Sequence, residues 1–329
     1  MIAPAEEVLP ANLCPLIKST FGFHLEKANP FLEMAELIVA ETTCDGKKKM
    51  YELMAESRPM HVLELPQKPD DADAFEHWHA EIKKLRNALE RRFETQIDDD
   101  KLRAGIREMN LERRYRRELA EAMKSDAPSL TGCQLLEYGN IISCIPSDFE
   151  QYARGLEELK DVRPVANADQ RVRVMLTGVP IAHGSERVLG LLEERGGLVV
   201  AMENCSGLKP ILDDIDEDAE DPLRAIAEKY FHLPCSVMTR NSGRFDLLRR
   251  LAEEYRPECV VELVWQACLT YDVEAVSVHR FANDELKLPY LRIETDYSPS
   301  DSERIAMRIE ALYETIRGGI GVAAPERRS

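Results

Sequence analysis

The sequence predicts an α/β protein built from doubly wound domains with parallel sheets. Short apolar runs alternate with longer amphipathic segments along the chain, and strand–helix–strand repetition of this kind is typical of such domains. Several of the short runs are almost continuously apolar, which suits parallel strands buried on both faces. With 329 residues, of which 44% are hydrophobic, the chain has enough material for two domains.

The expected elements follow from hydrophobic periodicity. Short apolar runs predict strands, and apolar residues that recur every three to four positions predict helices between and after them. The predicted strands are residues 37–42, 61–65, 172–176, 198–202, 260–264 and 289–294, and the predicted helices of the second half are residues 185–195, 222–231, 243–255, 273–285 and 300–316.

The first half of the chain is more helical than the second. Residues 74–95 are amphipathic and rich in strong helix formers, and residues 98–124 continue in the same manner, which predicts an antiparallel helical hairpin at about 72–124. A polar stretch after Pro164 suggests a domain boundary. We therefore expect an N-terminal α/β lobe with the hairpin at 1–166, a C-terminal lobe at 167–317 and a flexible tail at 318–329.

The net charge of the chain restricts the classes of partner that it is expected to bind. Sixty acidic side chains against 43 basic ones leave a formal net charge of −17, which argues against nucleic acid or an anionic membrane as the main partner. No stretch approaches the roughly 20 apolar residues of a membrane span, and the first residues lack the pattern of a secretory signal. We therefore expect a cytoplasmic protein, whose eight cysteines are kept reduced rather than paired in disulfides.

Three of the cysteines follow predicted strands. Cys44 ends the run LIVAETTC, Cys205 ends LVVAMENC, and Cys268 follows VVELVWQA. Carboxyl ends of parallel strands meet at one edge of a sheet, where ligands bind, so these thiols can converge. Converging thiolates favour a soft metal, above all an iron–sulfur cluster, and helices that begin just after Cys44 and Cys268 would stabilise its charge. Free cysteine also packs in cores as a small hydrophobe, so position alone leaves both explanations open.

The remaining cysteines differ in their surroundings. Cys14 and Cys235 lie in loops beside proline, and no cysteine belongs to a C-x-x-C pair, so a zinc ribbon has no support. Cys259 lies inside an apolar strand and is expected in the core. For Cys133 and Cys144 packing is also the favoured explanation.

Several strings resemble the 2-hydroxyacyl-CoA dehydratase family, which also includes the benzoyl-CoA reductase subunits. The most specific is ETTCDGKKKMYELM at residues 41–54, which is too long for a chance match. The strings come in the family's order, cover nearly the whole chain and are most similar to the single-chain members called double-cubane cluster proteins. The others are NLCPLIKSTFGF (12–23), HVLELP (61–66), ENCSGLKP (203–210), LPCSVMTRNSGR (233–244), VWQACLTYDVEA (264–275) and YLRIETDYSPSD (290–301).

The resemblance implies two Rossmann-like lobes with an iron–sulfur cluster in the cleft between them. By the family's pattern, Cys14, Cys44 and Cys268 would hold one [4Fe-4S] cluster. In the double-cubane subgroup, Cys205 and Cys235 would help to hold a second cubane. The resemblance also implies very low-potential one-electron reductions, a separate ATP-hydrolysing iron–sulfur activase that supplies the electrons, and a homodimer.

The sequence departs from the family in three places. Val179 stands where many relatives have a cysteine, so no sixth ligand is evident, and Cys133 or Cys144 could substitute. Leu269 stands where relatives often have histidine, which removes a potential proton donor near the cluster. Relatives usually begin with a further segment, so we expect the N-terminal lobe to be truncated.

Other polar residues are weaker candidates. Asn241 and Arg244 lie in a segment that the family shares, which favours a role in supporting the cluster ligands or in substrate contact. Lys47, Lys48 and Lys49 open a helix, where the dipole disfavours positive charge. Their charge is interpreted as offsetting the cluster or receiving the activase.

Three functional hypotheses follow. The first is a double-cubane iron–sulfur reductase that is charged by the activase and acts on a small substrate, with the cluster rather than side chains carrying the chemistry. The second is a subunit of a 2-hydroxyacyl-CoA dehydratase, with a single [4Fe-4S] cluster and an acyl-CoA substrate. The third is a non-catalytic electron-transfer or scaffold protein.

Overall fold

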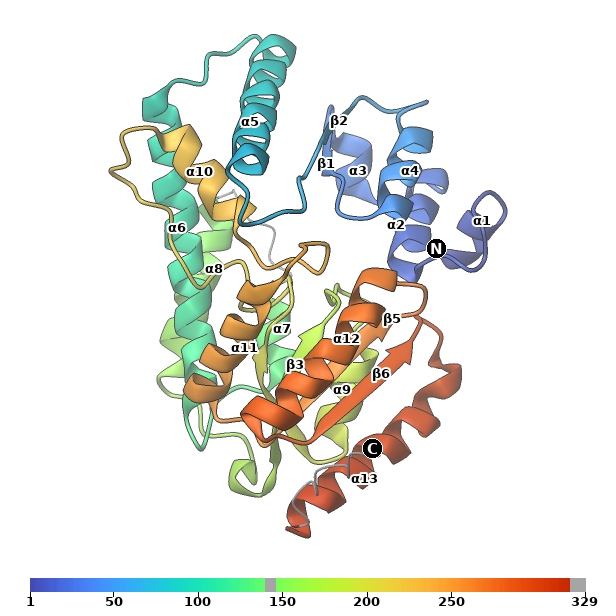
Figure 1. Cartoon of the computed structure of the whole chain (residues 1–329). Coiled ribbons are helices and arrows are strands. Elements are labelled where there is room, and N and C mark those ends of the chain that lie inside the picture. Colours follow the sequence, from blue (N-terminus) through green and yellow to red (C-terminus); the bar gives the residue numbers. More distant parts are fainter. Residues whose placement is uncertain (140–145, 320–329) are drawn as a thin grey trace. The chain divides into compact units, whose positions relative to one another are not determined.

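The chain divides into two compact units, each made of three chain segments (Figure 1). The computed structural model describes residues 1–139 and 146–319. The predicted division into residues 1–166 and 167–317 has a single boundary, and it stays a prediction. Unit 1 comprises Met1–Glu108, Ile215–Gly243 and Trp265–Asp272, and unit 2 comprises Met109–Asp214, Arg244–Val264 and Val273–Ser329.

Unit 1 contains a two-stranded parallel sheet with helices around it. β1 (Ile38–Glu41) and β2 (Met60–Leu63) pair in parallel, and α4 (Asp45–Met54) connects them as the crossover that parallel strands require. Its other helices are α1 (Ile2–Glu6), α2 (Pro15–Leu25), α3 (Pro30–Met34), α5 (Ala72–Phe93), the first part of α6 (Asp99–Glu121) and α10 (Pro222–Phe231).

One buried hydrophobic cluster of unit 1 forms where α5 packs against α10. The buried indole of Trp78 donates a hydrogen bond to the backbone carbonyl of Ala227 at 3.1 Å. Phe75 meets Phe231 edge-on, with 5.6 Å between the ring centroids, a favourable aromatic geometry. α5 is therefore anchored to α10, while its packing against α6 as a hairpin stays a prediction.

Unit 2 contains a four-stranded sheet with the strand order β4-β3-β5-β6. The central pair is parallel and places Thr177 opposite Glu262, and β4 is also parallel to β3. The strands are β3 (Val172–Gly178), β4 (Gly197–Met202), β5 (Cys259–Trp265) and β6 (Tyr290–Thr295). The helices are α7 (Gly132–Gly139), α8 (Pro146–Leu159), α9 (Arg187–Glu194), α11 (Ser242–Tyr255), α13 (Ser302–Arg317) and α12 (Leu269–Phe281), whose first turn belongs to unit 1.

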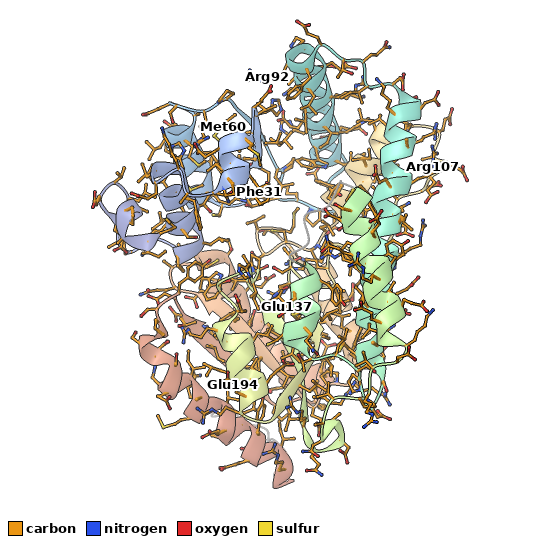
Figure 2. All side chains as sticks on the ribbon, turned by 180° about the vertical axis from the view of Figure 1, so that it is seen from behind. Phe31, Met60, Arg92, Arg107, Glu137 and Glu194 are labelled. Carbon is orange, nitrogen blue, oxygen red and sulfur yellow. The ribbon has the colours of Figure 1, made fainter. Side chains whose placement is uncertain are left out.

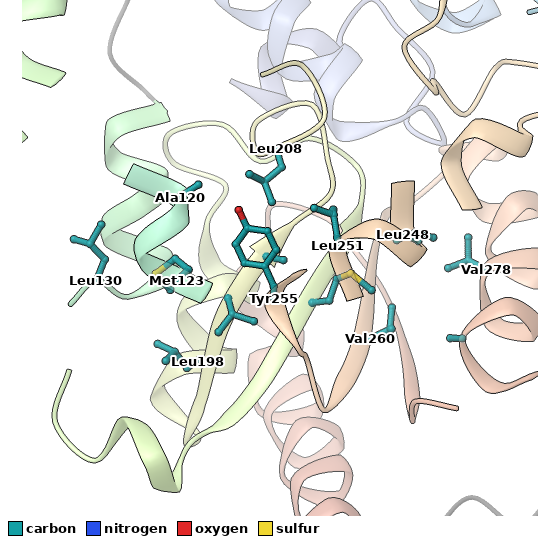
Figure 3. Packing of buried hydrophobic residues seen from close by; sticks show 14 of the residues in the cluster. Ala120, Met123, Leu130, Leu198, Leu208, Leu248, Leu251, Tyr255, Val260 and Val278 are labelled. Carbon is teal, nitrogen blue, oxygen red and sulfur yellow. The ribbon is translucent and has the colours of Figure 1, made fainter. Parts of the chain in front are cut away.

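Both faces of this sheet are covered. Met175 and Val260 belong to a cluster of buried residues from α6, α11 and α12 (Figure 3). Their strand neighbours Val174 and Val261 are also fully buried, and adjacent residues of a strand point to opposite faces. Helices on both sides of a parallel sheet confirm the predicted α/β class.

The predicted elements agree with the structure in type and differ at their ends. All of the predicted strands are present, and the predicted helix at 273–285 corresponds to α12, which begins earlier, directly after Cys268. α2, α7 and α8 were not predicted. Among the described residues, no helix is both long and apolar enough to cross a membrane.

Charged side chains such as Glu137 and Glu194 lie at the surface of unit 2 (Figure 2).

Candidate functional site

Three cysteines of unit 1 share one structural setting: each lies directly before a helix. Cys14 is the N-cap of α2, Cys44 is the N-cap of α4, and Cys268 precedes Leu269, the first residue of α12. The sequence analysis proposed these three as the ligands of one cluster. The structure brings them together in unit 1.

Backbone N–H groups in the first turn of each helix act on its thiol. The N–H of Lys47 donates to the sulfur of Cys44 at 3.4 Å, and the N–H groups of Leu16 and Ile17 lower the pKa of Cys14. Cys268 receives the N–H of Tyr271 in the same way. Backbone donors and the positive end of the helix dipole favour the thiolate. The arrangement therefore stabilises negative charge on sulfur.

The thiols also interact with one another. Cys14 and Cys268 are joined by a hydrogen bond, which lowers the pKa of Cys14 to about 7 and, together with burial, raises the pKa of Cys268. The negative charge of the Cys44 thiolate raises the pKa of Cys14 and so opposes this lowering. The Cys14–Cys268 pair thus releases its first proton easily and holds its second tightly.

Close packing of α4 against α2 brings the segments that carry Cys14 and Cys44 into contact. Gly46 follows Cys44 by two positions, and a Cβ added to it would lie 2.8 Å from the Cδ1 atom of Ile17 and 3.2 Å from that of Leu13. Leu13 and Ile17 flank Cys14 in the sequence. The start of α4 therefore rests directly on the segment that carries Cys14.

The donor set consists of thiols, which are the ligands of iron–sulfur clusters. Within the described part of the chain, no group of three His, Cys, Asp or Glu residues could hold one metal ion. In an iron–sulfur cubane the cysteine thiolates bind different irons. Soft thiolates at three helix starts could supply such ligands.

Cys235 lies in the same unit, close to the start of α12. The hydroxyl groups of Ser236 and Thr270 are hydrogen-bonded at 3.1 Å, and Thr270 is only two residues from Cys268. Cys235 itself is half-buried and packs beside the core of α5 and α10. Its loop therefore borders the candidate site.

The remaining cysteines lie in unit 2 or outside the described residues. Cys205 follows β4 and is exposed. Burial and the carboxylate of Glu193 raise the pKa of Cys133 to about 12, which disfavours the thiolate that a metal needs. Cys259 is fully buried at the start of β5, as predicted. Cys144, the other possible sixth ligand, lies outside the described residues.

The two positions that depart from the family's pattern have ordinary structural surroundings. Val179 is 1% exposed, and its carbonyl accepts a hydrogen bond from the side chain of Asn204 at 3.2 Å. Leu269 is 72% exposed at the start of α12. Val179 is thus a core residue of unit 2.

Arg244 forms a buried ionic cluster in unit 2 that sequence reasoning did not foresee. Its guanidinium is fully buried and pairs with Glu203 at 3.3 Å, Glu262 at 3.0 Å and Glu274 at 2.5 Å. Lys209 is 2.8 Å from the other oxygen of Glu203. The signal for this cluster was a glutamate inside the apolar strand VVELV, because buried carboxylates require partners.

The carboxylates of this ionic cluster have different environments. Burial by itself would raise the pKa of Glu203, but Lys209 and Arg244 outweigh it and lower that pKa. Burial dominates at Glu262 and raises its pKa, although Arg244 and the hydroxyl of Tyr290, which donates at 2.6 Å, act against it. Asn241, the other predicted supporting residue, is buried in unit 1. A role of Arg244 or Asn241 at the cluster ligands stays a prediction.

The fold and the thiol site define an α/β protein with helix-capping cysteines suited to an iron–sulfur cluster. The model of the family "2-hydroxyglutaryl-CoA dehydratase, D-component" matches residues 1–316, and the chain belongs to this family. It is 38% identical over 322 residues to the Escherichia coli (strain K12) protein named "Putative dehydratase subunit YjiM". That alignment covers 96% of this chain and 83% of the relative.

Proposed function

We propose that the protein is a subunit of a 2-hydroxyacyl-CoA dehydratase that holds one [4Fe-4S] cluster through Cys14, Cys44 and Cys268. The observation that carries the proposal is the shared setting of the three thiols, each at the start of a helix in unit 1. Membership of the dehydratase D-component family supports the reaction class, and the name of the E. coli relative agrees with it.

In this proposal the side chains of the site bind, orient and stabilise the cluster. The N–H groups at the starts of α2, α4 and α12 stabilise the thiolate charge. Ligation removes the proton that Cys14 and Cys268 share, because metal binding requires thiolates and releases protons. When bound, the cluster would supply a single low-potential electron for the removal of water from an acyl-CoA.

The double-cubane reductase remains a second candidate because of Cys235. The Ser236–Thr270 hydrogen bond places the Cys235 loop beside the start of α12, as a further ligand in unit 1 would require. Cys205 lies in unit 2, and the chain's family is that of the dehydratase component. These observations favour the dehydratase subunit over the double cubane.

The proposed partners follow from the proposed reaction. A D-component implies at least one further dehydratase subunit, and an ATP-dependent iron–sulfur activase would deliver the electron. For the double-cubane alternative, a homodimer replaces the further subunit. Pull-down of the tagged chain under strictly anaerobic conditions, with and without ATP, distinguishes a stable subunit from a transient activase.

Iron and sulfide counts on anaerobically purified protein test the proposal. We expect about four irons per wild-type chain. Each of the variants Cys14→Ala, Cys44→Ala and Cys268→Ala should lose this iron, whereas Cys133→Ala should keep it. About eight irons, reduced by Cys205→Ala or Cys235→Ala, would replace the proposal with the double-cubane candidate. A chain that binds no iron after anaerobic reconstitution would contradict both and leave the scaffold hypothesis.

A further inference from the structure

Three consecutive lysines at the start of α4 have different surroundings. Lys48 pairs with Asp45 at 2.9 Å and Lys49 pairs with Glu52, and both of these lysine side chains are exposed, at 49% and 67%. The side chain of Lys47 is 27% exposed and turns toward β1. The three residues share one charge and one helix turn, so only their contacts distinguish them.

The ammonium group of Lys47 connects two residues on either side of Cys44. It forms an ion pair with Glu41 and a hydrogen bond with the hydroxyl of Tyr51, whose ring centroid lies 5.7 Å away. Its backbone N–H donates to the sulfur of Cys44 at 3.4 Å. One residue therefore contacts the thiol directly and also spans the segment that carries it.

The segment around Cys44 is short and is anchored at both ends. Glu41 is the last residue of β1, and Tyr51 lies in the second turn of α4. The hydroxyl of Thr43 also donates to the Glu41 carboxylate, at 3.4 Å. Nearer the strand, the hydroxyl of Thr42 accepts the backbone N–H of Leu65 at 2.9 Å. With the Lys47 bridge in place, the connection from strand to helix has little freedom.

A lysine in the first turn of a helix is unfavourable for helix stability unless its side chain makes compensating contacts. A cation in the first turn of a helix opposes the helix dipole, and exposed ion pairs such as those of Lys48 and Lys49 contribute little. The side chain of Lys47, by contrast, contacts a carboxylate and a phenol, and the backbone N–H of the same residue donates to the thiol of Cys44.

We propose that Lys47 is a positioning residue that holds the thiol of Cys44 in the orientation needed for cluster ligation, whereas Lys48 and Lys49 have no such role. The inference rests on the proposed cluster at Cys14, Cys44 and Cys268. The residues that support metal ligands typically change metal affinity about 10- to 100-fold when they are substituted. Lys47→Gln should therefore weaken retention of the cluster without removing any of its ligands.

The test compares Lys47→Gln with Lys48→Gln, which removes the same charge from the next position. In anaerobically purified protein, we expect Lys47→Gln to accelerate iron loss to excess chelator about 10-fold, whereas Lys48→Gln keeps the wild-type rate. Glu41→Gln removes the other half of the ion pair and should behave as Lys47→Gln does. Equal rates for Lys47→Gln and Lys48→Gln would overturn the proposal.

Hydrogen exchange in the cluster-free chain gives an independent readout. Lys47→Gln and Glu41→Gln should raise the exchange rate of the backbone amides of residues 42–48, and Lys48→Gln should not. If the wild-type chain takes up no iron, the proposed function fails, but this exchange comparison still decides whether Lys47 restrains the segment. If Lys47→Gln does not fold, Glu41→Gln carries both measurements, and its wild-type behaviour would contradict the proposal.

Discussion

The thiol site of unit 1 and the ionic cluster of unit 2 stabilise their polar groups by different interactions. The three cysteines depend on backbone N–H groups and on each other. In contrast, Arg244 is surrounded by the carboxylates of Glu203, Glu262 and Glu274, so opposite charges meet within the cluster. The first arrangement concentrates negative charge on sulfur and suits a cationic ligand. The second already contains its counterions and suits stability.

The comparison teaches where a functional site can be expected in this fold. A thiolate is costly to form unless positive charge or hydrogen-bond donors stabilise it, so clustered thiols are suited to binding a cation. A buried ion pair that is complete needs no ligand, and breaking it is more costly than never having formed it. Substitutions in the two regions should therefore have different consequences.

The largest expected effect is the loss of the cluster from Cys268→Ala. Iron content should fall to background because a ligand is gone, while the unfolding free energy of the cluster-free chain changes by only about 1 kcal/mol. Iron analysis and denaturant unfolding under anaerobic conditions measure the two quantities. Full iron content in this variant would remove Cys268 from the site.

Arg244→Met should have the opposite profile. Removing the cation leaves buried carboxylates without their partner, which destabilises proteins by about 3–5 kcal/mol, and denaturant unfolding measures the loss. The exposed Arg250→Met is the matched control and should change the unfolding free energy by about 0.5 kcal/mol or less. A small effect of Arg244→Met would mean that the carboxylates find other compensation.

Glu262→Gln should have a smaller, pH-dependent effect. Folding raises the pKa of Glu262 from its ordinary value of 4.5, so this residue contributes stability below pH 4.5 that is lost as the pH rises through the folded pKa. Glutamine does not titrate, so the stability of the variant relative to wild type should increase as the pH rises above 4.5. Unfolding curves at a series of pH values test this, and a constant difference would contradict it.

The smallest effect is expected for Cys133→Ala. Its thiol lies beside Glu193, and its pKa of about 12 keeps it protonated at neutral pH. Iron content should stay unchanged, and the unfolding free energy should change by about 1 kcal/mol or less. Loss of iron in this variant would revive Cys133 as a cluster ligand and bring unit 2 into the site.

The sequence predicted the strands and the thiols better than the helices around them. Continuous apolar runs identify buried parallel strands without further information, and Cys44 and Cys268 could be placed at strand ends from that pattern. α2 was missed because Cys14 was interpreted as a loop residue beside Pro15, although proline is favoured in the first turn of a helix. The order Cys14-Pro15 is thus a helix start.

Contacts between distant residues could not be predicted from the sequence. Arg244 was predicted to support cluster ligands because of its sequence neighbours, but its partners Glu203 and Glu274 come from other elements. Likewise, nothing in the run Lys47–Lys49 distinguishes its members before the turn of α4 directs one inward. Such differences arise from tertiary packing, which local pattern does not encode.

The hydrogen bond between Cys14 and Cys268 has a consequence for how the protein must be assembled. A thiol and a thiolate in contact are the two halves of a disulfide, and an oxidant that removes two electrons would join them. Without metal, air would close the site by a covalent bond, and a thiol reductant would reopen it. In the proposed function, iron and sulfide would therefore have to reach these cysteines before oxygen does.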